Sequence, residues 1–279
     1  MERQWVRLLT TKGLSERRAC LSLEVGRASI RYQVRPENEK NVRLRVEMRK
    51  LSMRHRRWGS PRMSGFFWKR YGYNHKRVER LWDQERLAIP RKKRRRLKGT
   101  PVWDRPQPAT RPNEVWSFDF VFERTPYGRK LKMLVVIDEF TRECLEIRVE
   151  GRMRWQDVLE TLDELIAERG APTFTRTDNG SEFIAIELRK WLREKGITPI
   201  YIEPGSPWQN GFVESFNGKF RDECLDQEIF YSRGEAQVIV DWYRKSYNEE
   251  RPHSSLGYLT PAEMAAGQGA SPLGLSCWD

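Results

Sequence analysis

The sequence has few cysteines and histidines, and their spacing argues against a site built from them. The four cysteines lie far apart without a C-x-x-C pair, and none of the three histidines stands at ligand spacing from them. Zinc sites and disulfide frameworks both need closely spaced ligands or paired cysteines. We therefore expect neither, and we expect a protein that works in a reducing environment.

Long apolar stretches are also missing. No segment approaches the roughly 20 apolar residues that are needed to span a bilayer. The first ten residues have no apolar core of the kind found in a secretory leader. These absences predict a soluble, intracellular protein.

Charge, by contrast, is plentiful and unevenly placed. Residues 1–100 contain 30 Lys and Arg against 9 Asp and Glu, whereas residues 101–279 contain 22 against 30. A basic half joined to an acidic half is typical of a nucleic-acid-binding arm attached to a differently charged body. A solvated basic surface without a dedicated partner is the alternative.

The basic half is predicted to be helical from residue 1 to 90. Residues 14–33 favour two short helices with a turn at 24–26, and Ser15 is a candidate N-cap. This pattern fits a helix-turn-helix that reads DNA, and it fits a generic helical hairpin equally well. Further helices are expected at about 37–54, after Pro61, and after Asn74.

Residues 91–112 are predicted to be a basic, proline-rich linker. Six consecutive cations open it, followed by prolines at 101, 106, 108 and 112; the cations are Arg91, Lys92, Lys93, Arg94, Arg95 and Arg96. A run of like charge cannot pack with itself. It serves either as a solvated tether or, as we favour, as a contact to DNA phosphates.

The pattern changes at residue 113, where strands alternate with helices. Strands are expected at 115–122, 130–138, 144–149, 173–177 and 197–202, with helices at 156–169 and 182–195. The order β-β-β-α-β-α-β followed by helices predicts an α/β, ribonuclease-H-like catalytic domain with a mixed five-stranded sheet. We assign it to residues 113–225, with a helical extension at 226–279, preceded by the small all-α basic region.

Three carboxylates stand at informative places in this domain. Asp119 interrupts an apolar strand, where an ionised carboxylate is costly without a cation or hydrogen bonds. Asp178 follows a strand end, where α/β sheets bind ligands. Glu214 lies on a later helix, after Asn210 and Gly211. Each alone has a structural explanation: a buried polar group, a turn, and a surface helix residue.

With their flanking residues, these carboxylates resemble those of a known family. The chain resembles the transposases of bacterial insertion sequences of the IS-three type, in particular the product of the second reading frame, which have a retroviral-integrase-like core. The matching words are Trp116-x-x-Asp119-Phe120, Thr177-Asp178-Asn179-Gly180-Ser181-Glu182-Phe183, Asn210-Gly211-x-x-Glu214-Ser215-Phe216-Asn217, and Arg251-Pro252-His253. The resemblance is close over about 110–265 and looser over 40–90.

The resemblance implies a DNA transposase that performs metal-dependent cleavage and strand transfer at insertion-sequence ends. It implies that Asp119, Asp178 and Glu214 form the catalytic, metal-binding triad, with Mg²⁺ or Mn²⁺ as cofactor and two ions in the site. Hard oxygen ligands suit these metals. It also implies that Arg221 lies near DNA, and we add Lys219, Asn210 and the six cations at 91–96 as candidate DNA contacts.

The partners follow from the same resemblance. They are double-stranded DNA, namely element ends and target, and further copies of the chain on that DNA. No heptad run for a leucine zipper is present, so a protein from the upstream frame is a candidate partner. The expected location is the bacterial cytoplasm, at the nucleoid.

Two other functions compete with this prediction. A ribonuclease-H-like nuclease would keep the triad and cut DNA without joining it. A DNA-binding protein without catalysis would have little use for carboxylates that repel phosphate. Single residues also stay open: His253 and Asp138 fit either the active site or a structural role.

Overall fold

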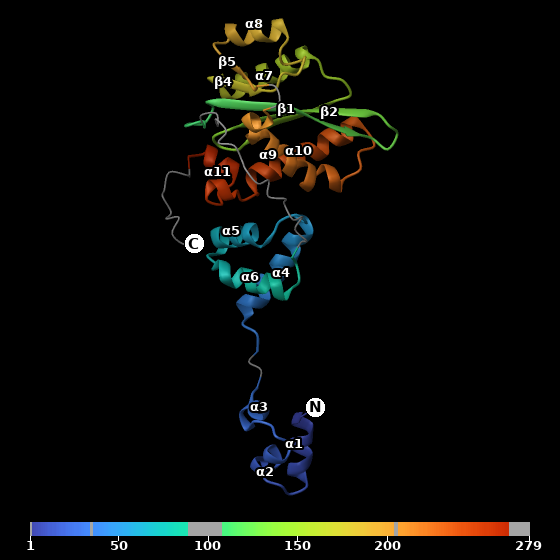
Figure 1. The fold of residues 1–279 in the computed structure, drawn as a ribbon, viewed down its shortest axis with the longest axis vertical. Helices are drawn as coiled ribbons and strands as arrows, with labels where there is room; N and C mark the ends of the chain where they lie inside the picture. The colour runs from blue at the N-terminus through green and yellow to red at the C-terminus, as the bar shows by residue number, and fades with distance from the viewer. Residues whose placement is uncertain (1, 34–35, 89–107, 204–205, 268–279) are drawn as a thin grey trace. The chain divides into compact units, whose positions relative to one another are not determined.

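The computed structural model describes residues 2–33, 36–88, 108–203 and 206–267 (Figure 1). They belong to two compact units, residues 1–46 and 47–279. The elements of the described chain are α1 (Glu2–Thr11), α2 (Glu16–Ser22), α3 (Arg27–Arg31), α4 (Glu39–Arg54), α5 (Ser60–Tyr71), α6 (His75–Gln84), β1 (Val115–Arg124), β2 (Lys130–Asp138), β3 (Cys144–Glu150), α7 (Trp155–Arg169), β4 (Phe174–Thr177), α8 (Ile186–Glu194), β5 (Thr198–Tyr201), α9 (Gly211–Glu223), α10 (Arg233–Glu249) and α11 (Pro261–Ala265), with short 3₁₀ turns at Pro207–Asn210, Leu225–Gln227 and Ser254–Leu256. None of the helices in these ranges is long and apolar enough to cross a membrane.

The first unit contains the predicted pair of short helices. The hydroxyl of Ser15 accepts the N–H of Arg18 at 3.4 Å and so begins α2. The turn that follows α2 places Glu24 in the left-handed region, with φ 53°. Within the region expected to be helical, no separate helix was predicted at residues 2–11, where α1 supplies Val6 to the small core that it shares with Ala19 and Cys20.

In the second unit, α5 and α6 pack against each other. Pro61 lies in the first turn of α5, where its missing N–H costs nothing. The side chain of Asn74 accepts the N–H of Lys76 at 2.9 Å and begins α6. The apolar stripe of α6, including Leu81 and Trp82, is buried. The predicted helix starts at Pro61 and Asn74 are therefore confirmed.

The sheet of this unit has the order β3-β2-β1-β4-β5. The pairs β1–β2 and β2–β3 are antiparallel, whereas β1–β4 and β4–β5 are parallel. Three meandering strands followed by two strands that return through helices form the mixed five-stranded sheet of a ribonuclease-H-like domain. The predicted fold class is confirmed.

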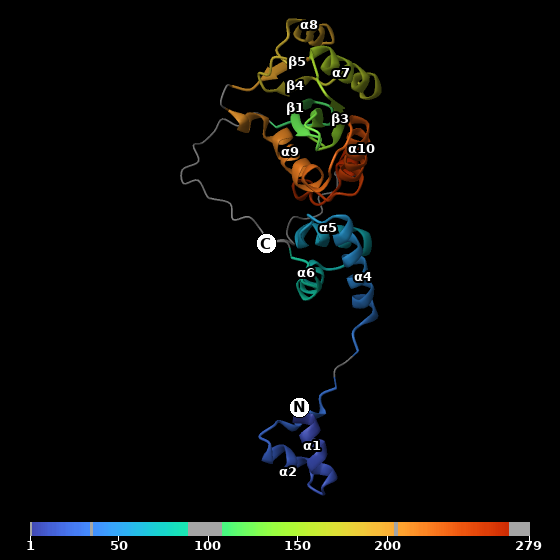
Figure 2. The same cartoon turned by 90° about the vertical axis from the view of Figure 1, so that its right-hand side faces the viewer.

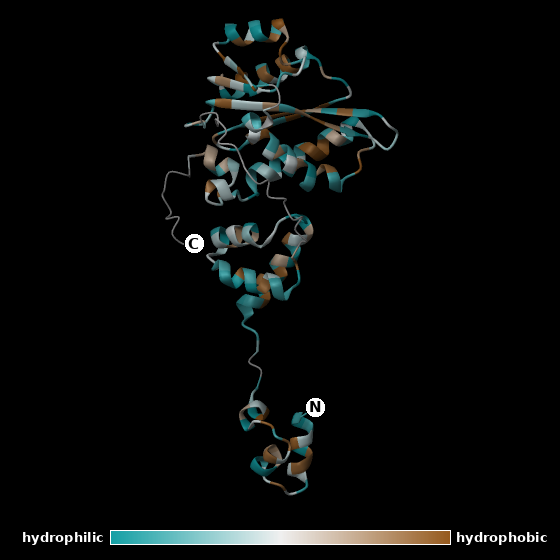
Figure 3. Cartoon of the chain, in the orientation of Figure 1, coloured by the Kyte–Doolittle hydropathy of each residue, from teal (hydrophilic) through white to brown (hydrophobic). Residues whose placement is uncertain are grey.

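Helices cover both faces of the sheet (Figures 1 and 2). One face packs against α7 and α8 and buries Trp116 and Phe118 of β1. The other face packs against α9 and α10 and buries Val121 of the same strand. The flanking helices carry hydrophobic and hydrophilic residues together, as the colours of Figure 3 show, which is typical of helices buried along one side. Alternate residues of β1 thus face different layers.

The helix expected at 182–195 was predicted to begin too early. Residues 181–184 form a turn, in which the N–H groups of Phe183 and Ile184 bond the carbonyl of Gly180 at 2.9 and 3.1 Å. The Phe183 ring stacks on Phe120 of β1, with centroids 4.5 Å apart. A ring held against the sheet in this way delays the start of α8 until Ile186.

The C-terminal elements pack against α4 and α5 within the second unit. Ion pairs connect them: Arg54 with Glu250 at 2.8 Å, Arg62 with Glu223 at 3.5 Å, Arg57 with Asp222, and Lys69 with Glu263. At Gly65 of α5, an added Cβ would lie 2.4 Å from Cδ1 of Tyr258. Only glycine allows this ring to approach α5 so closely.

Candidate active site

Asp119 lies in the middle of β1, opposite Val135 of β2. Because side chains alternate along a strand, it shares the face of Val121, which α9 covers. One carboxylate oxygen accepts the N–H of Phe120 at 2.8 Å, and the other accepts the side-chain amide of Asn217 at 2.9 Å. The strand and the helix α9 together fix the position of this carboxylate.

Asp178 reaches the same face through the pairing of β1 with β4. Ser117 and Arg176 are register partners in these parallel strands, so two residues further on Asp119 and Asp178 take neighbouring positions. The Asp178 carboxylate accepts the N–H of Gly180 at 2.9 Å. The side chain of Asn179 donates to the carbonyl of Ile202 at 2.7 Å, which fastens the loop after β4 to the chain beyond β5.

Glu214 lies in the first turn of α9, three residues before Asn217. Residues three apart share one side of a helix, so Glu214 projects from the side of α9 that bonds Asp119. It is the most exposed of the three carboxylates. Partial burial still raises its pKa.

The three carboxylates influence one another electrostatically. The pKa of Asp119 is raised to about 6, chiefly by burial and also by the charges of Asp178 and Glu214, against the lowering effect of its hydrogen bonds from Phe120 and Asn217. In the part of the chain that the structure describes, no group of three or more Asp, Glu, His or Cys side chains is arranged to hold a metal ion, so the three carboxylates do not form a ready metal site in this structure. Asp119, Asp178 and Glu214 are hard oxygen donors, and the charges of the other two act on Asp119.

A buried ion pair lies directly behind this cluster. Arg176 of β4 donates to both carboxylate oxygens of Glu139 at 2.7 Å, and the hydroxyl of Ser117 also bonds Glu139. All three residues are at most 2% exposed. Ser117 and Arg176 are register partners. The hydrogen bonds that both donate to Glu139 therefore join β1 to β4 two residues before Asp119 and Asp178.

The sequence did not single out this buried cluster. A usable signal was present, since Arg176 is the one charged residue of the strand β4. Asp138 has a structural role in the same region. Its carboxylate accepts the N–H groups of Asn113, Phe140 and Thr141 at 2.6 to 2.9 Å.

The predicted DNA-contacting residues of α9 occupy different settings. Arg221 is 45% exposed and donates to Glu123 at 3.3 Å and to the carbonyl of Phe122 at 3.1 Å. Lys219 is half-buried and donates to the hydroxyl of Ser215 at 2.8 Å. Asn210 is buried just before the helix. The cations Arg91, Lys92, Lys93, Arg94, Arg95 and Arg96 lie outside the described residues.

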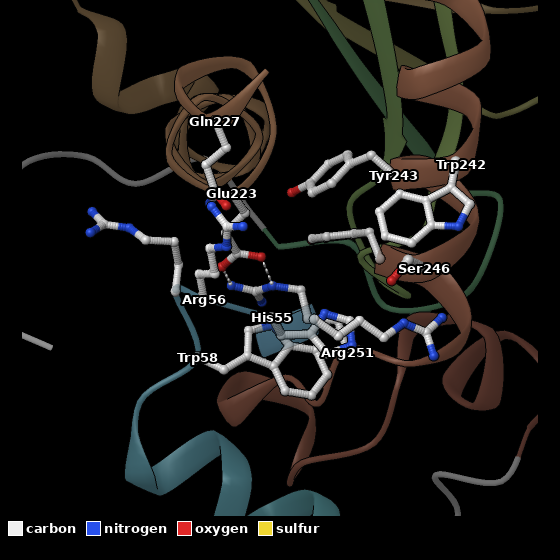
Figure 4. Close-up of a pocket in the computed structure, with 12 residues that line it drawn as sticks. His55, Arg56, Trp58, Glu223, Gln227, Trp242, Tyr243, Ser246 and Arg251 are labelled. Atoms are coloured by element: carbon white, nitrogen blue, oxygen red, sulfur yellow. Dashed lines mark hydrogen bonds and ion pairs between the residues drawn. The ribbon is translucent and has the colours of Figure 1, made fainter. Parts of the chain in front are cut away.

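The segment Arg251-Pro252-His253 packs against the end of α9 and contacts its last residue, Glu223. In Figure 4 the guanidinium of Arg251 points at the carboxylate of Glu223, which accepts its two N–H groups at 2.8 and 2.6 Å. Below them, the His55 ring stacks on Trp58 with centroids 3.9 Å apart. His253 is buried edge-on to Tyr247. Burial, followed by the neighbouring cations, lowers the pKa of His253 to about 2, so its ring is neutral.

Known families match the regions that hold these residues. Residues 109–207 match one family model described as an integrase core domain, and residues 195–261 match a second model with the same description. Asp119 and Asp178 fall in the first match, and Glu214 falls in the second.

Relatives extend the similarity to most of the chain. A 31.7 kDa protein of insertion element IS407 from Burkholderia multivorans is 40% identical over 91% of this chain and 91% of its own length. A putative transposase for insertion sequence IS150 from Escherichia coli is 32% identical over 68% of this chain and 70% of its own length. Among solved structures, the HTLV-2 integrase catalytic core domain in complex with magnesium matches 55% of this chain and 97% of its own, at 16% identity and a TM-score of 0.45.

These matches assign the class of protein. The chain belongs to the bacterial insertion-sequence transposases with an integrase-like core, and the resemblance noted in the sequence is confirmed. Within that class, the chain is similar to insertion-element proteins such as that of IS407.

Proposed function

We propose that this protein is a DNA transposase in which Asp119, Asp178 and Glu214 carry out metal-dependent cleavage and strand transfer. Membership of the family makes DNA transposition its function. The observation that supports the finer assignment is the raised pKa of Asp119, to which burial and two further carboxylates contribute. A divalent cation bound by these carboxylates would offset the free-energy cost of holding their negative charges close together and partly buried.

The residues fit a hard divalent cation such as Mg²⁺ or Mn²⁺, and their carboxylate oxygens would hold it. When bound, a pair of such ions activates the attacking oxygen and stabilises the leaving oxygen of an in-line displacement. Asn217 and the N–H of Phe120 orient Asp119, and the N–H of Gly180 orients Asp178. The nucleophiles in this proposal are water for cleavage and a DNA 3′-hydroxyl for joining, without a covalent enzyme intermediate.

The DNA is proposed to lie along the basic parts of the chain. Arg221, Lys219 and Asn210 would contact it beside the triad, the cations at 91–96 would contact its phosphates, and the helical region 1–90 would bind DNA as well. Support comes from the 30 Lys and Arg among residues 1–100. Three further points stay predictions: several copies assemble on DNA, a protein from the upstream frame is a partner, and the protein associates with the nucleoid.

Cleavage and joining assays on DNA carrying the element's own ends test this proposal. Asp178→Asn should abolish both reactions, in Mg²⁺ and in Mn²⁺, while DNA binding is retained or strengthened because a negative charge is lost. Glu203→Gln, which removes a carboxylate from the exposed chain after β5, is the matched control and should stay active. Full activity of Asp178→Asn, or full turnover of the unaltered protein in a chelator, would refute the metal assignment. Cleavage without any joining would point to a nuclease instead.

A further inference from the structure

A cavity of about 580 Å³ lies along the side of α9 that carries Ser215 and Lys219. Its walls are of two kinds. Its aromatic residues include Trp208, Phe212 and Tyr247. Positively charged side chains come from Arg142 and Lys219, and His253 adds an imidazole ring. Ser215 directly follows Glu214 in α9, although none of the three carboxylates lines the cavity. Its size is within the range of roughly 300–1,000 Å³ that is typical of small-ligand pockets.

Positive charge in this region exceeds the negative charge available to balance it. Glu223 is already engaged by Arg251 and Arg62. Within the described residues, Lys219 forms no ion pair, and its ammonium donates to the hydroxyl of Ser215. Burial, together with Arg251, lowers the pKa of Lys219 to about 8. A half-buried ammonium without an acidic partner loses part of its hydration, and an anion in the cavity would offset that loss.

Arg142 provides a second and independent sign of a missing ligand. One terminal nitrogen of its guanidinium is buried without a hydrogen-bond partner. Its backbone is in the left-handed region, with φ 63°, a conformation that costs free energy for a residue with a long side chain. The guanidinium lies 3.9 Å above the Phe212 ring. Cation and ring are thus held together at the cavity wall.

We infer that this cavity receives one unpaired nucleotide of the DNA substrate, with its base against Trp208 and Phe212 and its phosphate near Lys219 and Arg142. Every nucleobase has a flat face that stacks on aromatic side chains, and phosphate oxygens pair with buried cations. A paired base inside a duplex is covered on both faces by its neighbours, so the nucleotide must leave the stack before its base can lie against an aromatic wall. This inference rests on the proposed DNA transposase function and adds a binding site to it.

The test measures DNA binding in the Asp178→Asn protein, so that its outcome does not depend on catalysis. Three short duplexes of one sequence serve as probes: one fully paired, one with a single unpaired adenosine, and one with an abasic nucleotide at that place. We expect the unpaired adenosine to bind more tightly than the paired duplex. The abasic duplex should fall between them, because it keeps the phosphate and lacks the base.

Variants assign the preference to the cavity. Trp208→Ala should lower the affinity for the unpaired duplex about tenfold, as expected for the loss of one stacking partner, and leave the paired duplex unchanged. Trp208→Phe should restore most of the loss. Lys219→Gln should weaken the unpaired and abasic duplexes alike. Tyr127→Ala, which removes an aromatic ring that is 74% exposed in the β1–β2 turn, is the matched control and should change nothing.

Equal affinity of the Asp178→Asn protein for paired and unpaired duplexes would overturn the inference. So would an equal loss for both duplexes in Trp208→Ala, since the tryptophan would then support only the fold. Neither result bears on the triad, which the cleavage assay tests separately.

Discussion

The side-chain amide of Asn217 on α9 holds one oxygen of Asp119 on β1 at 2.9 Å. Because this bond fixes the direction of the carboxylate, we expect Asn217→Ala to weaken its hold on a divalent ion. Loss of a residue that orients a metal ligand typically costs about 10- to 100-fold in metal affinity or activity. A titration of cleavage with Mg²⁺ should show half-maximal activity at a correspondingly higher concentration.

Gly218→Ala is the control for that experiment. It changes the neighbouring residue of α9, where an added Cβ meets no atom within 4 Å, and should leave the Mg²⁺ dependence as it is. An Asn217→Ala protein with an unaltered Mg²⁺ requirement would show that the amide has no orienting role.

The buried pair of Arg176 and Glu139 should be sensitive to the loss of one partner. Glu139→Gln leaves the guanidinium buried without a negative charge, which costs roughly 3–5 kcal/mol of folding stability. The double variant Glu139→Leu with Arg176→Met removes both charges and should be less destabilised than Glu139→Gln. Denaturant unfolding compares the variants, and a double variant that is the less stable of the two would contradict this explanation.

Acidification should destabilise the protein through His55. Burial lowers its pKa from 6.5 to about 4, although the charge of Glu250 raises it in part. Between these two values the unfolded chain takes up a proton that the folded chain rejects, so folding stability is lost as the pH falls from 6.5 toward 4. His55→Gln removes this contribution.

The measurement is the difference in unfolding free energy between the unaltered protein and His55→Gln, taken at pH 7.5 and at pH 5. The unaltered protein should lose more stability than the variant. His75→Gln removes a histidine from the start of α6 instead and serves as the comparison. Parallel losses in the unaltered protein and His55→Gln would count against a neutral, buried His55.

The cations at 91–96 should make DNA binding depend strongly on salt. Each phosphate contact changes the slope of log affinity against log salt concentration by roughly 0.9. Replacing Arg91, Lys92, Lys93, Arg94, Arg95 and Arg96 by glutamine should therefore reduce the slope by up to about 5. A salt series of binding measurements gives the slope directly, and an unchanged value would make this segment a tether alone.

Much of the fold could be predicted because local rules and tertiary packing agree in it. The strands β1, β2 and β3 were evident from dense apolar runs, and the helix starts at Ser15 and Asn74 from their capping side chains. The start of α8 could not be found locally, because the position of Phe183 is decided by its contact with Phe120 on another strand.

The candidate site was predictable to different degrees. Asp119 and Asp178 lay at informative positions, one as a charge within an apolar strand and one at a strand end, but each alone also had a structural explanation. Glu214 resembles any exposed helix residue, and only the family words singled it out. The bond from Asn217 to Asp119 and the cavity beside Lys219 depend on how α9 lies on the sheet, and no sequence pattern encodes that placement.

The close fit of Tyr258 against Gly65 sets an order on synthesis. A ribosome releases α5 early, yet the ring that covers this glycine emerges only when almost the entire remaining polypeptide has been made. Until then, the flank of α5 stays open to solvent, and the nascent N-terminal part cannot complete its packing by itself. A messenger that ends before Tyr258 would thus yield a chain in which this side of α5 stays uncovered.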